Sequence, residues 1–285
     1  MRSKGLQYMV ASAFLFSIMS VLVKVAGQRL DSAQIVLARV LVALVMSYWS
    51  LRRGGISPWG TTHRHLLVLR GLLGFGGLSC YFYAVTKLPL GDASVIMYMN
   101  PIFVGLLAAL FLKERVRPVE LAAVALSLAG VACIAQPSFL FGEGASRLDP
   151  AAVVIALVGA FFAASAYTTV RALSGKEHPM VVVFYFPLMA TPLALPYAWS
   201  RLLWPTPLEW VLLVSVGVTT QIAQILMTRG LYLERAGKAT AVTLLQVVFA
   251  FLWGALLFAE LPTWLSATGA VLVLLGSFVA ARAEH

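Results

Sequence analysis

Long apolar runs, separated by short polar segments, alternate along almost the whole chain. Ten of these runs are long enough, or nearly so, to cross about 30 Å of hydrocarbon as helices. We place them at residues 6–26, 33–51, 66–86, 91–112, 118–136, 150–172, 179–199, 208–232, 238–259 and 264–282. The connecting segments are short and leave no room for a soluble domain. The pattern therefore predicts an all-α integral membrane protein with ten transmembrane helices.

The helical pattern occurs twice. Four residues of the first half, Gly91, Ala93, Glu114 and Gly130, recur 146 residues later as Gly237, Ala239, Glu260 and Gly276. Each copy holds five spans, so the second copy must enter the membrane from the opposite side. We therefore divide the chain into a first repeat at 1–137 and a second at 150–285, and predict that they are inverted. Inverted repeats are typical of carriers that bind a solute between the halves.

Composition and charge agree with a lipid environment. The chain is 61% hydrophobic and only 11% charged, whereas soluble domains are about half apolar and a quarter charged. The net charge of +10 does not indicate a nucleic-acid partner. With the N-terminus in the cytoplasm, most Lys and Arg lie on the cytoplasmic side, which is the positive-inside pattern. This predicts a multi-pass protein of the cell (inner) membrane with both termini cytoplasmic.

Two further features of the sequence bear on the class of protein. Residues 1–26 are not interpreted as a cleaved signal peptide, because removal would leave nine spans and unpair the first span from the sixth. Cys80 and Cys133 both lie in spans and form no disulfide or metal-binding pattern. We therefore expect neither a metal site nor a cofactor.

The end of the fourth span carries a family resemblance. The segment Phe111-Leu112-Lys113-Glu114-Arg115 and its counterpart Phe258-Ala259-Glu260 resemble the EamA domain. Two such domains in tandem are similar to the drug/metabolite transporter superfamily over the whole chain. The resemblance implies a central cavity formed by spans one to four and six to nine, with spans five and ten at the periphery. It also implies transport of amino acids, metabolites, drugs or nucleotide-linked compounds.

Some of the most distinctive residues are expected to be structural. Glu114 and Glu260 lie at membrane edges just before another helix begins, where a carboxylate can accept hydrogen bonds from free helix N–H groups. The alternative is that Glu114 and Glu260 take part in gating or contact the substrate. The third span contains Gly71, Gly74, Gly76 and Gly77. Small residues let helix backbones approach closely in lipid, so these glycines predict a close helix contact rather than a binding site.

Ionisable residues within the hydrocarbon are the default candidates for a site. The eleven carboxylates and four histidines fall in loops or at span ends, which favours a facilitator, exchanger or voltage-driven carrier over proton symport. Arg39 is the exception, about 9 Å inside the second span by helical rise. It either binds a substrate carboxylate or phosphate as a bidentate fork, or extends to the outer interface or pairs within the protein.

Asn100 and Gln246 are a matched amide pair near the middle of the bilayer. Asn100 is about 15 Å deep in the fourth span by helical rise, and Gln246 is equally deep in the ninth. An amide serves either a polar solute or an interhelical hydrogen bond, and the adjacent Pro101 frees a nearby carbonyl. Six other residues complete a candidate wall of aromatic and polar groups: Tyr81, Tyr83, Met97, Tyr98, Gln221 and Gln224.

These patterns together predict a secondary transporter of small organic metabolites that works by alternating access. Arg39 favours an organic anion or a zwitterion such as an amino acid. A channel or a scaffold protein is the first alternative, and a membrane-embedded enzyme is a weaker one. The expected partners are a small-molecule substrate and the lipid bilayer, with the chain acting as a monomer or a homodimer.

Overall fold

The structure is a computed structural model. It describes the backbone of residues 3–88, 90–114, 117–137, 140, 149–258 and 263–282, and the side chains of these residues except 85, 86 and 90–92. Within these ranges all regular structure is helical, and ten segments are long and apolar enough to cross a membrane. The predicted all-α fold with ten spans is confirmed.

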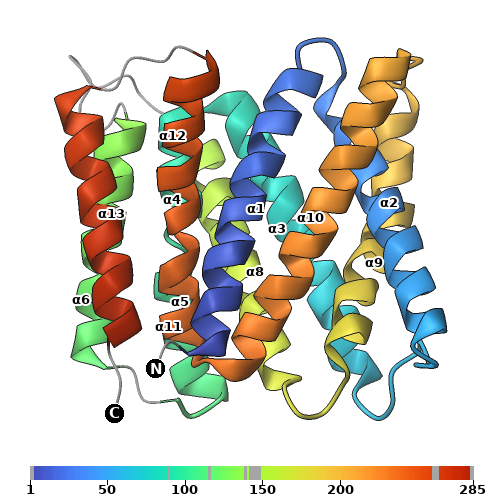
Figure 1. Cartoon of the computed structure of the whole chain (residues 1–285), viewed down its shortest axis with the longest axis horizontal. Helices are drawn as coiled ribbons and strands as arrows, with labels where there is room; N and C mark the ends of the chain where they lie inside the picture. Colours follow the sequence, from blue (N-terminus) through green and yellow to red (C-terminus); the bar gives the residue numbers. More distant parts are fainter. Residues whose placement is uncertain are drawn as a thin grey trace. The chain divides into compact units, whose positions relative to one another are not determined.

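In the described part of the chain, eight of the ten spans are single helices, which can be followed in Figure 1. They are α1 (Lys4–Ala26), α2 (Ser32–Arg53), α3 (Arg64–Lys87), α6 (Pro118–Ala135), α8 (Pro150–Ala172), α9 (Pro179–Trp199), α10 (Pro207–Leu233) and α13 (Trp264–Arg282). The fourth and ninth spans each consist of two helices. The fourth comprises α4 (Leu90–Met97) and α5 (Asn100–Phe111), and the ninth comprises α11 (Ala236–Thr243) and α12 (Leu245–Phe258).

The helices gather in two compact units, and each unit takes helices from both halves of the chain. Unit 1 comprises Met1–Leu72 and Thr169–Leu233, and therefore contains α1, α2, α9 and α10. Unit 2 comprises Leu73–Thr168 and Glu234–His285, and contains α4, α5, α6 and α11 to α13. Helices α3 and α8 each begin in one unit and end in the other.

In unit 1, α1 and α10 pack along their lengths in opposite directions. Near the start of α1, Met9 fills the space that a side chain at Gly230 would take. One turn further on, the Ser12 hydroxyl donates to the Ala223 carbonyl at 2.8 Å. Residue numbers rise along α1 while they fall along α10, so these helices are antiparallel. A glycine and a small polar side chain let the two backbones approach closely.

In unit 2, α6 and α13 form a second antiparallel pair. A Cβ at Gly130 would lie 2.5 Å from the Gly269 carbonyl oxygen, so glycine is required at this crossing. Near the end of α6, the Gln136 amide donates to the Thr263 hydroxyl at 3.1 Å, close to the start of α13. Helices α6 and α13 are the fifth spans of the two halves. Equivalent spans therefore run in opposite directions, as the predicted inversion requires.

Small residues also bring α3 and α8 together. A Cβ at Gly76 would lie 2.9 Å from the Phe162 ring, and one at Gly77 would lie 3.1 Å from the Ala163 nitrogen. Earlier in α3, Gly71 faces Met189 of α9 inside unit 1, at 2.6 Å from the corresponding Cβ position. These positions agree with the close helix contact that the glycines predicted.

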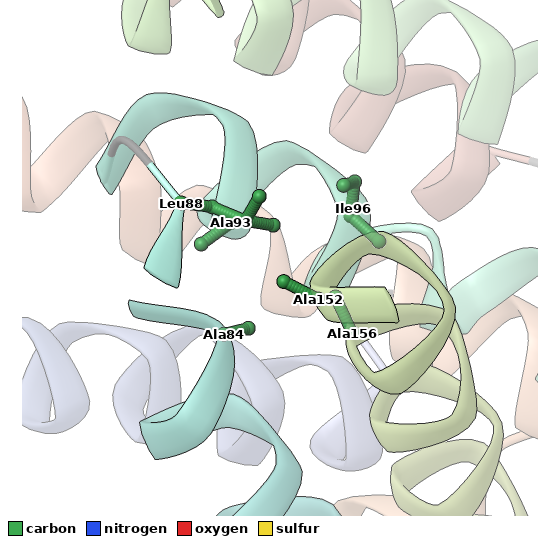
Figure 2. Close-up of a cluster of buried hydrophobic side chains, with 6 residues drawn as sticks. All are labelled: Ala84, Leu88, Ala93, Ile96, Ala152 and Ala156. Atoms are coloured by element: carbon green, nitrogen blue, oxygen red, sulfur yellow. The ribbon is translucent and has the colours of Figure 1, made fainter. Parts of the chain in front are cut away.

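An apolar cluster continues the contact of α3 and α8 in unit 2. It joins α3, α4 and α8 through six buried side chains, four of them alanines, as Figure 2 shows: Ala84, Leu88, Ala93, Ile96, Ala152 and Ala156. The cluster fixes α4, the first half of the fourth span, against α8.

Candidate functional site

The fourth and ninth spans are both interrupted, and at equivalent positions. Helix α4 ends at Met97 and α5 begins at Asn100, while α11 ends at Thr243 and α12 begins at Leu245. Tyr98, in the first interruption, corresponds to Leu244 in the second after the 146-residue step of the repeat. Both interruptions lie in unit 2, where α5 packs against α11. Discontinuous helices in corresponding places of two inverted halves are the structural mark of a transporter binding site.

Proline explains the first interruption. Pro101 has no N–H, so the Met97 carbonyl cannot receive the usual helical hydrogen bond from four residues ahead. The chain tightens here: the Met99 amide donates to the Ile96 carbonyl at 3.1 Å, and the Ile102 amide to the Met99 carbonyl at 3.0 Å. Such three-residue bonds within an α-helix often mark a hinge.

The second interruption has the same kind of three-residue bonds, one position earlier in the repeat, but no proline. The Leu244 amide donates to the Ala241 carbonyl at 3.4 Å, and the Val247 amide donates to the Leu244 carbonyl at 3.0 Å. Val247 stands where the first half has Pro101. The two spans therefore share a break in the helical ladder, although only one of them carries the residue that forces it.

The matched amides lie directly after the two interruptions. Asn100 is the first residue of α5, and Gln246 is the second residue of α12; both are half-buried. The Asn100 Oδ1 atom is buried and has no hydrogen-bond partner among the described residues. Buried polar atoms in proteins are almost always hydrogen-bonded. An acceptor in this state, at a helix break inside a span, is suited to a polar ligand.

Three of the predicted wall residues lie beside the first interruption. The Tyr81 side chain is hydrogen-bonded to Ser94 of α4, and Tyr98 lies close to Tyr81 and Tyr167. Met97 packs its sulfur against Gly159 of α8, where a Cβ would lie 3.2 Å away. The structure thus gathers Tyr81, Met97 and Tyr98 at the break. Tyr83, two residues after Tyr81 in α3, is 40% exposed.

In unit 1, two arginines lie over one aromatic ring. The Arg39 Cζ atom of α2 is 6.0 Å from the centroid of the Phe186 ring, and the Arg70 Cζ atom of α3 is 5.0 Å from it. Arg70 is buried, with only 3% of its surface exposed. A guanidinium over an aromatic face is attracted by the negative charge density of the ring. Two positive charges are therefore held on one side chain of α9 within the spans of unit 1.

The sequence alone places Arg70 among the basic residues of the cytoplasmic side that set topology. It lies four residues inside the predicted span 66–86, which is deeper than an interface residue needs to be. This depth is the one sequence signal that pointed to a role within the span.

The two glutamines of α10 differ in their surroundings. Gln221 is buried and donates to the Ser47 hydroxyl of α2 at 2.6 Å, while that hydroxyl donates to the Ala43 carbonyl at 2.7 Å. Gln221 therefore ties α10 to α2. The Gln224 Nε2 atom, one turn further along, is buried without a hydrogen-bond partner among the described residues. Of the two amides, Gln224 is the one that keeps a donor for a ligand.

Glu114 holds the beginning of the ninth span. Its Oε2 atom accepts a hydrogen bond of 3.0 Å from the amide of Ala236, the first residue of α11. Close by, Arg235 forms an ion pair with Glu120 of α6 at 3.1 Å. Glu114 thus caps a helix, as its position predicted, but the helix comes from the other half of the chain. Glu260 lies outside the described residues.

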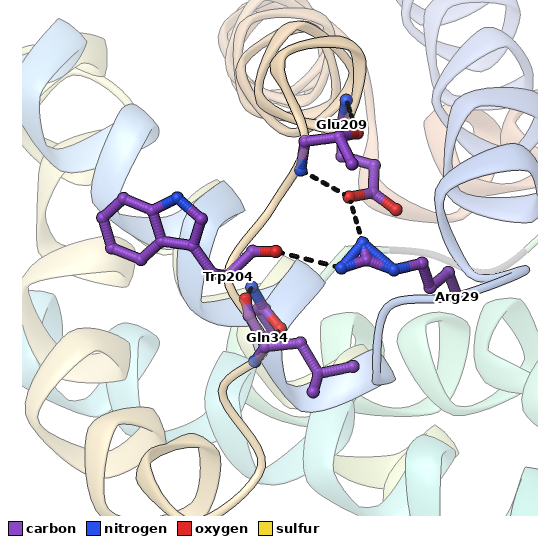
Figure 3. A network of polar contacts seen from close by, with 6 residues as sticks. Arg29, Gln34, Trp204 and Glu209 are labelled. Atoms are coloured by element: carbon purple, nitrogen blue, oxygen red, sulfur yellow. Dashed lines mark hydrogen bonds and ion pairs between the residues drawn. The ribbon is translucent and has the colours of Figure 1, made fainter.

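One end of unit 1 is closed by polar contacts between the connections of neighbouring helices. Figure 3 shows Arg29 bound to the Glu209 carboxylate at 2.8 Å and to the Trp204 carbonyl at 3.0 Å. Beside it, Gln34 donates to the Leu203 carbonyl at 2.7 Å and accepts from the Leu203 amide at 3.0 Å. These contacts join the ends of α1 and α2 to the connection between α9 and α10.

Glu177 performs the corresponding task in another connection of unit 1. Its carboxylate accepts from the Thr61 amide at 2.9 Å and from the His63 amide at 3.2 Å, just before α3 begins. Burial by itself would raise the pKa of Glu177, but these hydrogen bonds and the nearby His63 hold the pKa below its ordinary value of 4.5.

Within the described ranges, no three His, Cys, Asp or Glu side chains gather as metal ligands would.

Comparison with known proteins agrees with this arrangement. A model of the EamA-like transporter family matches residues 3–136 and 150–282. The chain is similar to the pseudopaline exporter CntI of Pseudomonas aeruginosa strain UCBPP-PA14, with 34% identity over 98% of this chain and 96% of the relative. It is also similar to human solute carrier family 35 member G1, with 29% identity over 97% of this chain and 78% of the relative.

Two more distant likenesses extend the comparison. A riboflavin transporter of Brucella anthropi is 25% identical over 97% of this chain and 98% of the relative. One solved crystal structure superposes on the whole of both chains with a TM-score of 0.86 at 19% identity. At that identity the superposition concerns the fold alone.

Proposed function

Because the chain belongs to the EamA-like transporter family, we propose that it is a secondary transporter that moves an organic anion, or a zwitterion such as an amino acid, by alternating access. Family membership makes it a multi-pass membrane transporter of small molecules and not an enzyme. The finer proposal concerns the class of substrate, the residues that bind it and the mechanism. We also propose that residues 1–137 and 150–285 act as the two inverted halves.

The observation that carries the mechanism is the pair of equivalent interruptions at residues 98–99 and 244. A helix break frees backbone groups within the membrane and places them where a solute can use them. Asn100 and Gln246 add an amide directly after each break, and Tyr81, Met97 and Tyr98 supply apolar and aromatic surface beside the first. We assign these five residues to substrate binding. We propose that the breaks also act as hinges, so that opening on one side is coupled to closing on the other.

The class of substrate is inferred from Arg39. A guanidinium within a span is costly to bury, and its fork geometry matches a carboxylate. A carrier of cations would be expected to hold a carboxylate at this depth. In the described part of unit 1, the carboxylates Asp31, Glu177 and Glu209 instead hold groups at helix ends. We therefore assign Arg39 to the anionic group of the substrate, with Gln224 as a further candidate ligand.

Location and orientation are also proposed. The bias of Lys and Arg supports the cell (inner) membrane with both termini in the cytoplasm. Fusion of reporters to the C-terminus tests this orientation. A fluorescent protein should be bright and alkaline phosphatase inactive, and the reverse pattern would contradict the assignment.

Thermal stability in the presence of candidate substrates tests the proposed function. The panel comprises amino acids, carboxylates, nucleotides, and the pseudopaline and riboflavin that occur in the names of relatives. A ligand that binds only the folded protein raises stability by mass action. We expect carboxylates or amino acids to raise Tm in the wild-type chain and in Arg53→Ala, which removes an exposed arginine at the end of α2, but not in Arg39→Ala. Stabilisation that survives in Arg39→Ala would contradict the assignment of Arg39.

A further inference from the structure

A groove lies in unit 2 between α5 and α6, and it reaches the start of α11. Its walls are small or apolar, and they include Pro101 and Gly105 of α5 and Leu121 of α6. A Cβ at Gly105 would meet nothing within 4 Å, so this glycine leaves open space beside α5. Leu121 is 52% exposed, and an exposed apolar surface on a span marks contact with the membrane. The groove is therefore open to lipid.

The length of the groove matches one leaflet of a bilayer. Its deeper end is at Pro101, beside the break in the fourth span and ten residues before α5 ends at Phe111. Ten residues of helix rise about 15 Å, which is half of the roughly 30 Å of hydrocarbon in a bilayer. The other end lies at the edge of the membrane, where one span ends at Phe111 and two begin, at Pro118 and Ala236. An acyl chain from one leaflet matches this length.

The end of the groove at the membrane edge is lined by Glu114, Glu120 and Arg235. Glu120 is only 5% exposed, and its Oε2 atom accepts from the Arg117 amide at 3.4 Å. Its Oε1 atom lies 3.1 Å from the Arg235 guanidinium, but it is buried and accepts no hydrogen bond from the described residues. The contact with Arg235 is therefore an ion pair without an aligned N–H donor. A buried carboxylate oxygen in this state is suited to a ligand that donates a hydrogen bond.

These charges favour a zwitterionic head group with a primary ammonium. The Arg235 side chain is 29% exposed, and a guanidinium binds phosphate well. Glu120 calls for a cation that also donates, which a primary ammonium does with three N–H groups. A choline head group carries the positive charge but has no N–H, and a glycerol head group lacks the positive charge. Among these common phospholipids, phosphatidylethanolamine alone supplies both groups.

We propose that this groove binds phosphatidylethanolamine, with one acyl chain between α5 and α6, the phosphate at Arg235 and the ammonium at Glu120. The site does not depend on the proposed function, since no transported solute takes part in it. Because the groove ends at Pro101, the acyl chain packs beside the break in the fourth span.

Lipids that differ only in the head group test the requirement for a donor in the wild-type chain. Phosphatidylethanolamine, its monomethyl and dimethyl derivatives, phosphatidylcholine and phosphatidylglycerol, all with the same acyl chains, are added to the full chain in detergent. Native mass spectrometry measures the fraction of protein that carries lipid at each concentration. We expect phosphatidylethanolamine to bind about tenfold more tightly than phosphatidylcholine, the factor that one hydrogen bond to a charged group supplies. Binding should weaken with each added methyl group, and phosphatidylglycerol should show no preference over phosphatidylcholine.

Substitutions locate the lipid in the groove. Glu120→Gln keeps a side-chain acceptor but loses the charge, and should remove most of the preference for phosphatidylethanolamine. Gly105→Leu fills the open space beside α5 and should weaken the binding of phosphatidylethanolamine and phosphatidylcholine alike. Glu209→Gln is the matched control and should change neither. Glu209 is also the third residue of a helix that begins with proline, and it pairs with Arg29 at 2.8 Å, but it lies in unit 1.

The outcomes are decisive in either direction. Equal binding of phosphatidylethanolamine and phosphatidylcholine overturns the proposal, and so does tightest binding of phosphatidylglycerol, which would indicate a site for anionic lipids. A preference that persists in both Glu120→Gln and Gly105→Leu also overturns it, because the lipid then lies elsewhere. A preference that is lost in Glu120→Gln and kept in Glu209→Gln supports the site. The methylation series uses the wild-type chain, so it decides the requirement for a donor even if a variant does not fold.

Discussion

Single residues fix the connections of this protein by capping helices that are distant in the sequence. Glu177 holds the beginning of α3, from a connection 114 to 116 residues away in the chain. Glu114 holds the beginning of α11, 122 residues away. Glu114 accepts from the first N–H of α11, and Glu177 accepts from two amides that directly precede α3, so each carboxylate lies at the positive end of a helix. The stability of the connections therefore depends on the charge of a few carboxylates.

Glu177→Gln should lower stability by about 1 kcal/mol at neutral pH, because hydrogen bonds to a charged acceptor become hydrogen bonds to a neutral one. The pKa of Glu177 is lowered in the folded chain. Its contribution is therefore complete above the unfolded value near 4.5 and is lost as pH falls through the lower folded value. Melting curves of both chains from pH 7 to pH 3 should converge below about pH 4.5. A difference in Tm that is constant over this range would refute the role of the charge.

Glu114→Ala should destabilise the chain by about 1 kcal/mol, the usual cost of losing a helix cap. Glu114→Gln, which keeps an acceptor but loses the charge, should cost less. Neither change should alter which compounds raise Tm, because Glu114 binds the Ala236 backbone. Altered selectivity with unchanged thermal stability in Glu114→Gln would count against a structural role.

At the scale of single residues, the sequence indicated that Glu114 caps a helix but did not indicate which helix it caps. The edge position of Glu114 indicated a capping carboxylate, but capping of α11 depends on tertiary packing that spacing does not reveal. The contact of Arg70 with the Phe186 ring was beyond the sequence for a related reason. A basic residue near a span end has the same appearance in the sequence whether it faces the cytoplasm or the Phe186 ring.

Among the elements, the interrupted fourth and ninth spans differ from the other eight. Their hydrophobic runs were predicted as single spans, and both remain long enough to cross a membrane as Ala93–Phe111 and Ala236–Phe258. Pro101 made the first interruption visible in the sequence. The second, at Leu244, had no such mark, and only its place in the repeat indicates it.

Pro101→Ala restores the missing amide and should join α4 and α5 into a continuous helix. We expect an equal or higher Tm, because an internal proline costs a helix up to about 3 kcal/mol, together with slower transport, because a hinge is lost. Pro192→Ala is the matched control, since Pro192 is an exposed residue inside α9. Transport by Pro101→Ala at the wild-type rate would show that the break is not used as a hinge.

Glycine contacts make a separate prediction about the α6–α13 pair. Gly130→Ala places a Cβ 2.5 Å from the Gly269 carbonyl oxygen and should lower stability by about 1–3 kcal/mol, the usual range for overpacking. Gly105→Ala in α5 meets nothing within 4 Å and should raise stability by roughly 1 kcal/mol through helix propensity. Thermal unfolding of the two variants under one set of conditions makes the comparison. Equal effects of the two substitutions would refute a close crossing at Gly130.

For the whole molecule, the inversion of the two halves follows from an odd number of spans in each. The hydrophobic pattern was therefore sufficient to predict it, and the antiparallel α6–α13 pair agrees with it. The division into two units was beyond the sequence. Unit 1 combines α1 and α2 with α9 and α10, and such pairing of distant helices depends on contacts like Ser12 with Ala223, for which a single sequence has no periodic signal.

Counterflow in proteoliposomes tests the central claim, that this chain is a carrier of small organic anions. Vesicles containing the purified protein are loaded with unlabelled glutamate, and the uptake of radiolabelled glutamate is followed. We predict uptake that saturates with concentration, accelerates with internal glutamate, and is lost in Arg39→Ala but not in Arg53→Ala. Uptake equal to that of protein-free vesicles, or a flux that is linear in concentration and indifferent to internal glutamate, would contradict the account.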